Sequence, residues 1–304
     1  SHSYLSEKMN FIYSLGFLSP PKTIITQKIQ EVHRLYHELI AKRDEIEMMM
    51  DGMVVKVDDI ALEEELGYTV KYPKWMVAFK FPAIEKVTKI RSITLQVGRT
   101  GVVTPVAEVE AVNIEGVVVE RATLHNFDEI ERKDICIGDS VIIIRSGDVI
   151  PKIIKVLEQR RNGSEIAITR PQTCPVCHEE LLDDGALMKC QNLSCDARIV
   201  GAIIHFASKK ALNIDGLGDK IVEQLYAQKL VLHVKDLYYL TLEQLLSLEG
   251  FKEKKAINLL EAIEQSKNVS LEKFINALGI EHIGEVAAKK IARAFGYEWL
   301  EASY

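Results

Sequence analysis

The stretch DGMVVKVDDIALEEELGYTVKYPKWMVAFKFP, from Asp51 to Pro82, contains two short apolar runs that predict β-strands, at residues 53–57 and 75–81. Successive side chains of a strand point to opposite faces, so the alternating apolar residues of each run share one face. The single lysine of each run, Lys56 or Lys80, falls on the other face. Two cations on one side of a rigid strand pair suit a bound phosphate. The alternative is that each lysine is a solvated edge residue that discourages aggregation.

The residues around the two lysines favour the phosphate interpretation. Asp51-Gly-Met-Val-Val-Lys56, followed by Ala78-Phe-Lys80-Phe-Pro82, resembles the last two nucleotide-binding motifs of the covalent nucleotidyltransferases. The spacing, and the Lys74-Trp75 before the second motif, resemble the NAD-dependent DNA ligases of bacteria. This resemblance implies that Lys56 and Lys80 contact the nucleotide. It also implies that Asp51 is the acid of its motif, with a role at a metal ion or a phosphate.

The composition is that of a globular protein and does not by itself indicate a nucleic-acid partner. The chain has 304 residues, 47% hydrophobic and 27% charged, which suffices for more than one domain. Because the net charge is −6, any DNA contact must come from local patches and backbone amides. No apolar run reaches the roughly 18 residues of a membrane span, and no signal-peptide pattern is present. An odd number of cysteines, five, favours a metal site in the reducing cytoplasm.

Two amphipathic helices are expected before the strand motifs, over residues 4–17 and 25–50. The ligases that the chain resembles attach AMP to the lysine of a Lys-x-Asp-Gly motif, and this tetrapeptide does not occur in the sequence. We therefore expect that the chain begins partway through an adenylation domain. On this interpretation the 304 residues alone are inactive and are not adenylated by NAD.

Residues 84–158 have short β-rich runs and frequent glycines, which predict four or five strands of a small oligonucleotide-binding (OB) barrel. A purely structural barrel is the alternative. The segments at 98–101, 121–126 and 145–151 resemble signatures of the ligase barrel. Arg99, between two glycines on an expected loop, is the candidate for contacting a DNA phosphate. The polar residues 159–170 predict a linker.

Four cysteines form the chemically most specific motif of the chain: Cys174, Cys177, Cys190 and Cys195. Two cysteine pairs at this separation match a tetrahedral four-thiolate Zn²⁺ site. Such a site is structural, because no coordination position remains for water. His178 is expected to be exposed rather than a ligand, and Cys136 to lie in a strand as an inert core residue.

The last hundred residues predict helices with an internal repeat. The segments IDGLG at 214–218, LEGFK at 248–252 and IEHIG at 280–284 each precede an apolar-periodic helix. They resemble the helix-hairpin-helix motif, which binds DNA phosphates without sequence preference. The candidate DNA-contacting residues are Gly216, Gly218, Gly250 and Gly284. Lys252 and His282 stand where glycines are expected, so their hairpins are alternatively structural only.

We therefore predict a multidomain α+β chain. Its parts are an adenylation-domain segment (1–83), an OB-fold domain with linker (84–170), a four-cysteine zinc finger (171–198) and a helix-hairpin-helix domain (199–304). The resemblance implies an internal fragment of a bacterial NAD-dependent DNA ligase, a monomeric cytoplasmic enzyme of DNA replication and repair. The intact enzyme would use NAD and Mg²⁺ to seal a nick in duplex DNA, through enzyme-AMP and DNA-adenylate intermediates.

A protein of another class is the rival hypothesis. A non-catalytic, zinc-containing DNA-binding protein would account equally well for residues 84–304. It leaves unexplained the two lysine-bearing strands of the stretch 51–82.

Overall fold

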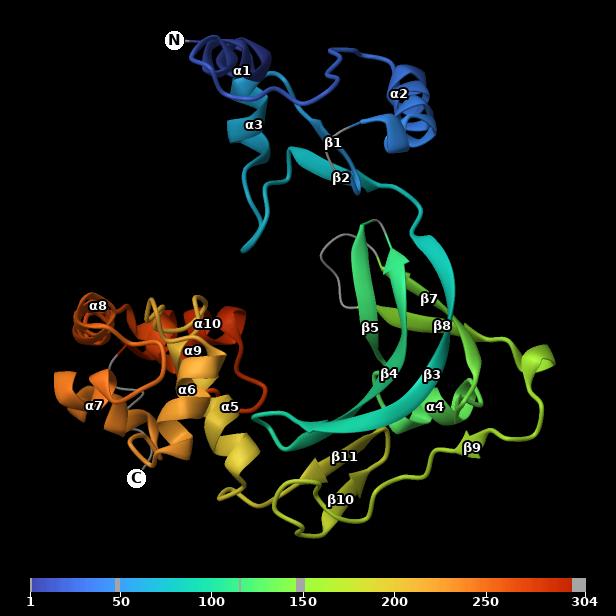
Figure 1. Cartoon of the computed structure of the whole chain (residues 1–304). Coiled ribbons are helices and arrows are strands. Elements are labelled where there is room, and N and C mark those ends of the chain that lie inside the picture. The colour runs from blue at the N-terminus through green and yellow to red at the C-terminus, as the bar shows by residue number, and fades with distance from the viewer. Residues whose placement is uncertain (1, 47–49, 115, 146–150, 297–304) are drawn as a thin grey trace. The chain divides into compact units, whose positions relative to one another are not determined.

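The structure is a computed structural model that describes residues 2–46, 50–114, 116–145 and 151–296 (Figure 1). Two compact units divide the chain. The first comprises segments 1–89, 109–122 and 140–159, and the second comprises segments 90–108, 123–139 and 160–304. Each unit is described by itself below.

The N-terminal segment of the first unit is two helices, a two-stranded sheet and a third helix. Its elements are α1 (Leu5–Ser14), α2 (Ile29–Ala41), the 3₁₀ turn η1 (Arg43–Glu45), β1 (Gly52–Lys56), α3 (Ile60–Leu66) and β2 (Met76–Lys80). The first predicted helix is confirmed, and it ends just before Gly16. The second was predicted too long at both ends. The hydroxyl of Thr26 accepts a hydrogen bond from the N–H of Lys28 and donates to Glu31, which favours a local turn over an earlier helix start.

β1 and β2 are antiparallel, with Met53 opposite Phe79 and Gly52 opposite Lys80. Helix α2 packs on one face of this strand pair. The rings of Tyr36 and Phe79 stack there with centroids 4.0 Å apart, and the Tyr36 hydroxyl donates to the carbonyl of Lys80. A small apolar cluster centred on Leu35, Leu39 and Phe81 stabilises this face.

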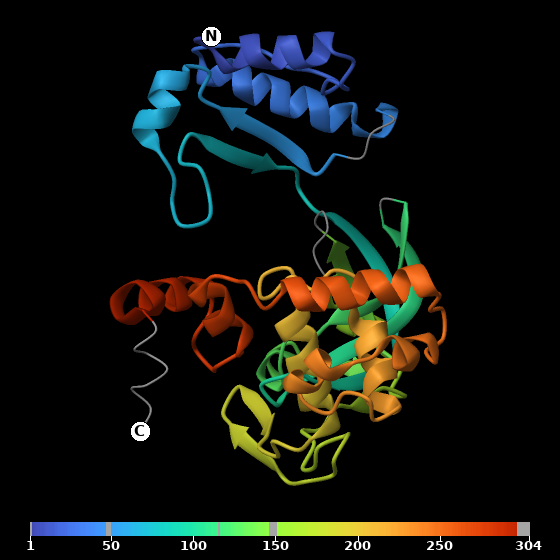
Figure 2. The same cartoon turned by 90° about the vertical axis from the view of Figure 1, so that its left-hand side faces the viewer.

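Two adjacent aspartates connect the strand pair to the flanking helices. Asp58 accepts hydrogen bonds from the backbone N–H and the hydroxyl of Ser6, at the start of α1. Asp59 is the N-cap of α3, where its carboxylate accepts from the N–H groups of Ala61 and Leu62. The loop after α3 then leads to β2 (Figure 2).

Five strands close into a barrel: β3 (Ile84–Val97), β4 (Val102–Ile114), β5 (Val117–Thr123), β7 (Ser140–Arg145) and β8 (Lys152–Val156). Their hydrogen-bonded order is β4-β3-β7-β8-β5, and β5 also pairs with β4. The predicted OB fold is thus confirmed, although β3 and β4 are long rather than short. Helix α4 (Phe127–Arg132) was not expected. Its N-cap is Asn126, whose side-chain oxygen accepts from the N–H of Glu129.

In the second unit, one arginine fixes the segment 160–170, which was expected to be a linker. After η2 (Glu158–Arg160), the guanidinium of Arg161 donates two hydrogen bonds to the fully buried carboxylate of Asp139 and pairs with Asp134. Strand β9 (Ile166–Ala167) pairs with β6 (Cys136–Ile137). Cys136 therefore lies in a strand as predicted, and burial raises the pKa of its thiol.

A β-hairpin lies between the two cysteine pairs. Its strands are β10 (Leu181–Asp184) and β11 (Leu187–Cys190), and β11 also pairs with the start of β4. Cys195 is the N-cap of helix α5 (Asp196–Ala207).

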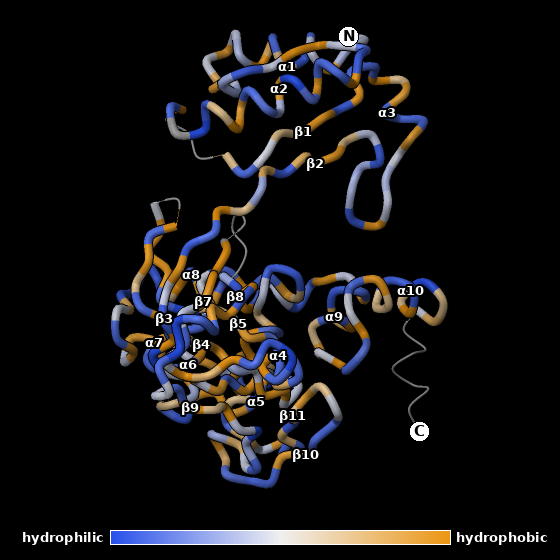
Figure 3. The backbone as a smooth tube through the Cα atoms, turned by 90° about the vertical axis from the view of Figure 1, so that its right-hand side faces the viewer, coloured by the Kyte–Doolittle hydropathy of each residue, from blue (hydrophilic) through white to orange (hydrophobic). Residues whose placement is uncertain are grey.

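The remaining elements are helical, as predicted. They are α6 (Asp219–Ala227), η3 (Val234–Tyr239), α7 (Leu242–Leu246), α8 (Glu253–Gln265), α9 (Leu271–Ala277) and α10 (Glu285–Phe295). One apolar core, with Ile203, Leu225, Leu245 and Leu259 at its centre, joins α5 through α8. Figure 3 shows hydrophobic and hydrophilic residues alternating along these helices. No helix among the described residues is long and apolar enough to span a membrane.

Candidate functional sites

The two lysines of the strand pair lie on the face opposite α2. The register makes Gly52, Val54 and Lys56 of β1 share a face with their partners Lys80, Ala78 and Met76. Both lysines are exposed, whereas Phe79 on the other face is half-buried. The predicted orientation is therefore confirmed. The Cα atoms of the two lysines lie four residue steps apart, about 13 Å along the strands.

Lys80 is held at one end of this face by Asp51. The Nζ atom of Lys80 lies 2.5 Å from Oδ2 of Asp51. This hydrogen bond lowers the pKa of the Asp51 carboxyl below its usual value, so the carboxylate stays charged. Gly52, which follows Asp51 and lies opposite Lys80 in the strand pair, is a glycine for a steric reason. A Cβ on Gly52 would lie 2.7 Å from Cα of Lys80 and from the carbonyl oxygen of Phe79.

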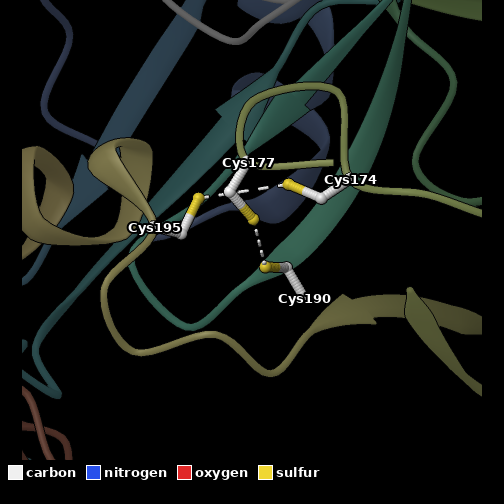
Figure 4. Close-up of side chains that lie close together, drawn as sticks. All are labelled: Cys174, Cys177, Cys190 and Cys195. Carbon is white, nitrogen blue, oxygen red and sulfur yellow. Dashed lines mark hydrogen bonds between the residues drawn. The ribbon is translucent and has the colours of Figure 1, made fainter. Parts of the chain in front are cut away.

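The four predicted cysteines converge on one point (Figure 4). Their sulfur atoms all lie within 4.8 Å of one another, with 4.0 Å between Cys174 and Cys195 and 3.5 Å between Cys177 and Cys190. A tetrahedral Zn²⁺ with four Zn–S bonds needs sulfurs about 3.8 Å apart. Cys174, Cys190 and Cys195 are buried. The donor set, its spacing and its burial therefore fit a closed metal site.

The surroundings of the thiols explain their different acidities. Hydrogen bonding from the backbone N–H of Glu179 lowers the pKa of Cys177 to about 7. Burial raises the pKa of Cys190 to about 12, and it raises that of Cys195. His178 is exposed, and its backbone N–H donates to the carbonyl of Cys174. It lies outside the sulfur cluster, as expected.

The three repeated segments share one backbone geometry. We name residues 214–218 hairpin 1, 248–252 hairpin 2 and 280–284 hairpin 3. In each, the N–H of the fourth residue donates to the carbonyl of the first, over 3.2, 3.3 and 3.1 Å. The third residue, Gly216, Gly250 or His282, has a positive φ of 81°, 75° or 66°. This combination is typical of a type II turn.

The fifth residue of each hairpin begins the next helix. Gly218, Lys252 and Gly284 are the N-caps of α6, α8 and α10, and no side-chain cap bond is present at any of them. Their backbone is extended, a conformation that any residue adopts, so Lys252 fits there without strain. A helix N-terminus without a side-chain cap is an arrangement that suits a bound anion. His282, in contrast, adopts a left-handed conformation that glycine favours.

Hairpins 1 and 2 border one open groove of about 840 Å³. Its lining includes Gly216, Gly250 and Lys252. Lys254 and Lys255 also line it, and the ammonium of Lys255 lies 4.2 Å from the centre of the Phe251 ring. Two hairpins and three lysines therefore meet at one surface.

Arg99 lies in the turn between β3 and β4, as the sequence predicted. The N–H of Gly101 donates to the carbonyl of Gly98, which closes this turn. The guanidinium also has a partner that the sequence did not suggest. Its Nη1 donates to the carbonyl oxygen of Gly279, 2.7 Å away, just before hairpin 3. The third barrel signature, 145–151, lies largely outside the described residues.

Several residues that shape these sites were missed by sequence reasoning. Gly52, Gly101, Gly201 and Gly279 each allow a close approach of two segments that are distant in the sequence. Lys189 forms an ion pair with Glu281, 92 residues away, at 2.6 Å. Gly52 and Gly101 lie in motifs that the sequence singled out, although their close contacts were not predicted, and Gly279 follows an amphipathic pattern, which is typical of a helix C-terminus.

Comparison with protein families matches three consecutive parts of the chain. Residues 2–84 match the NAD-dependent DNA ligase adenylation domain, and residues 87–165 match the NAD-dependent DNA ligase OB-fold domain. Residues 208–265 match a SAM-like helix-hairpin-helix tandem. The chain belongs to the NAD-dependent DNA ligase family.

Curated relatives named DNA ligase match nearly the whole chain. The protein of Sulfurovum sp. (strain NBC37-1) is 64% identical over 300 residues, which are 99% of this chain and 46% of that protein. The protein of Sulfurimonas denitrificans is 61% identical, again over 99% of this chain and 46% of its own length. The chain thus spans slightly less than half the length of these relatives.

Proposed function

We propose that this chain is the part of an NAD-dependent DNA ligase that grips the nucleotide phosphate and the nicked duplex. The observation that carries the proposal is the strand pair β1–β2 with its two lysines, in a segment that matches the ligase adenylation domain. The whole protein would transfer AMP from NAD to a lysine, then to the 5′-phosphate of a nick, and the 3′-hydroxyl would displace AMP. Mg²⁺ would neutralise phosphate charge during these steps.

The register of the strand pair suggests where a phosphate would bind. Lys56 and Lys80 lie at opposite ends of one face, and the middle pair on that face is Val54 and Ala78. Both lysine side chains can extend toward this middle, where the small Ala78 leaves room. A phosphate over the Val54–Ala78 pair would then receive both ammonium groups. Asp51 would keep Lys80 oriented until the nucleotide arrives.

The cysteine cluster and the hairpins would serve the duplex. We infer that the four thiolates hold a structural Zn²⁺, which would supply folding energy to a segment with little apolar core. Arg99 and the hairpin residues Gly216, Gly218, Gly250 and Gly284 would lie along the DNA backbone. Phosphate contacts of this kind carry no sequence information, which suits an enzyme that seals any nick.

Binding of the 304-residue chain to a nicked duplex tests this function. Fluorescence anisotropy over a series of salt concentrations should give an affinity that falls steeply with salt and is alike for unrelated sequences. Lys252→Gln should flatten the salt slope by about one unit, because one phosphate contact is lost. Lys86→Gln, on the exposed part of β3, is the matched control. Salt-independent binding, or a preference for one sequence, would contradict the proposal.

A further inference from the structure

Hairpin 3 lies outside the apolar core that holds the other two hairpins. The core cluster of the helical segment runs from Ile203 to Ala277, and the described cluster contains no residue of α10. Within α10 only Ala288 is buried, and this helix packs mainly on α9. Figure 2 shows α9 and α10 at the margin of the helices. Contacts other than the shared core must therefore fix the direction of hairpin 3.

The Arg99–Gly279 hydrogen bond is one such contact. Gly279 ends α9 with a φ of +65°, and its carbonyl accepts from Nη1 of Arg99 at 2.7 Å. A Cβ on Gly279 would lie 2.9 Å from the same Nη1 atom. Helix α9 itself is attached to α5 one turn earlier. There Nε2 of His205 hydrogen-bonds the carbonyl oxygen of Asn276. The buried side-chain amide of Asn276 donates to the carbonyl oxygen of Lys210.

Two further glycines bring the barrel turn against α5 and the cysteine cluster. A Cβ on Gly201, in the middle of α5, would lie 3.1 Å from Cβ of Arg99. A Cβ on Gly101 would lie 2.1 Å from the carbonyl oxygen of Cys190. The backbone N–H of Cys190 donates to the carbonyl of Gly101, and Nη1 of Arg198 donates to the carbonyl of Cys190. The barrel turn is thus fixed to a metal-ligand residue.

Strand β11, which ends at the cysteine cluster, also contacts hairpin 3 directly. Lys189 precedes Cys190 in β11, and its Nζ lies 2.6 Å from Oε1 of Glu281, the second residue of hairpin 3. Lys189 is largely buried and Glu281 is half-exposed. Two independent contacts, one from the barrel turn and one from β11, therefore reach residues 279–281.

We propose that Arg99 is a positioning residue that locks hairpin 3 to the barrel turn, with Lys189 as a second, weaker anchor. The anchoring itself does not depend on DNA. Its consequence for duplex binding rests on the function proposed above, since a fixed hairpin presents the α10 N-terminus to a phosphate without a further ordering cost. The remaining N–H donors of Arg99 stay available for the phosphate contact predicted from the sequence.

Hydrogen exchange of the DNA-free, metal-loaded chain tests the anchoring. In Arg99→Ala the amides of Gly279, Ile283 and Ala288 should exchange about tenfold faster, the effect expected when a charge-assisted hydrogen bond is lost. Arg99→Lys should restore part of the protection, because a lysine still offers one donor. Arg91→Ala, at an exposed arginine on β3, the strand that precedes this turn, is the control and should change none of these rates.

A second variant and a second region distinguish a local effect on hairpin 3 from misfolding of the chain. Gly201→Ala keeps Arg99 but pushes its backbone away from α5, so it should loosen the same three amides. The amide of Ala256 in α8 should stay protected in every variant. Unchanged exchange at 279–288 in Arg99→Ala would overturn the proposal. Equal loosening of α8 would overturn it as well, because the effect would then be global.

Duplex binding by the same variants separates the two proposals. If Arg99→Ala weakens binding of a nicked duplex while exchange stays normal, Arg99 only contacts phosphate and the anchoring is refuted. If exchange accelerates as expected while the unaltered chain binds no duplex, the anchoring stands and the proposed function fails. Weaker binding together with faster exchange is the expected result.

Discussion

Two small antiparallel strand pairs of the chain are stabilised in different ways. β1–β2 places aromatic side chains on one face, where Tyr36 stacks on Phe79 and Phe81 is buried. β10–β11 has a smaller apolar face, with Leu181 and Met188 as its buried apolar side chains, and it ends at the cysteine cluster. An isolated two-stranded hairpin is at best marginally stable in water. The first pair is therefore stabilised by a helix, and the second by its pairing with β4 and by the cysteine cluster at its end.

This difference decides what each strand pair leaves available for function. Because α2 covers one face of β1–β2, the other face is free to carry Lys56, Lys80 and the Asp51 carboxylate in a fixed register. In β10–β11 the cysteine cluster lies at the end of the strand pair. This pair contacts other elements through the backbone of β11, which pairs with β4, and through the side chain of Lys189. The first pair leaves a lysine-bearing face exposed, and the second connects to other elements of the fold.

Metal removal should give the largest difference between the two pairs. Chelation, or Cys190→Ser, should unfold residues 171–198, because in the proposed metal site thiolate–metal bonds would take the place of a hydrophobic core. Hydrogen exchange should show loss of protection in β10–β11 and unchanged protection in β1–β2. Cys136→Ser, outside the cluster, is the matched control. Full protection of β10–β11 after metal removal would contradict the dependence on metal.

Truncation of the aromatic stack should destabilise β1–β2 and leave β10–β11 unchanged. Phe79→Ala removes the ring that stacks on Tyr36, and it should lower the free energy of unfolding by about 2 kcal/mol, reduced from the fully buried case because Phe79 is half-buried. Denaturant unfolding measures this change. Val77→Ala, an exposed position on the same strand and face, should cost much less. Equal effects of both variants would mean that the helix does not stabilise the strand pair.

The smallest expected effect concerns the Asp51–Lys80 pair at low pH. Because Lys80 lowers the pKa of Asp51 in the folded state, the pair contributes stability above the ordinary carboxyl pKa of about 4 and loses it as the pH falls through the lowered value. NMR titration of the Asp51 carboxyl should give this lowered pKa. Lys80→Gln should return it toward the ordinary value. A pKa that does not respond to Lys80→Gln would refute the pairing.

The sequence predicted those features that depend on local pattern. Alternation of side chains gave the two faces of the β1–β2 pair, and cysteine spacing gave the converging sulfurs. The apolar period gave the helices of the last hundred residues. The strand faces and the helices follow from neighbours within a few positions, where the periodicities of strand and helix hold, whereas the cysteines follow from the spacing of a metal-ligand motif.

Most of the remaining features depend on distant contacts that no local pattern encodes. One difference is local, since helix α2 begins later than its apolar pattern suggests because the Thr26 hydroxyl accepts a hydrogen bond from the N–H of Lys28. The partner of Arg99 lies 180 residues away, and that of Lys189 lies 92 residues away. The long strands of the barrel also exceed their apolar runs, because pairing with neighbouring strands extends them. These are tertiary effects that override local preference. The domain boundaries predicted from composition, at 83, 170 and 198, stay predictions.

The third hairpin has a consequence for how such repeats are detected. The family match to the helix-hairpin-helix tandem ends at residue 265, before hairpin 3. Yet hairpin 3 has the same turn hydrogen bond and the same positive φ at its third residue, with His282 in place of glycine. The family match stops before this copy, in which His282 stands where a glycine is expected. By backbone dihedral angles, the described residues contain three such units. The number of repeats in such proteins is therefore better measured from backbone conformation than from sequence.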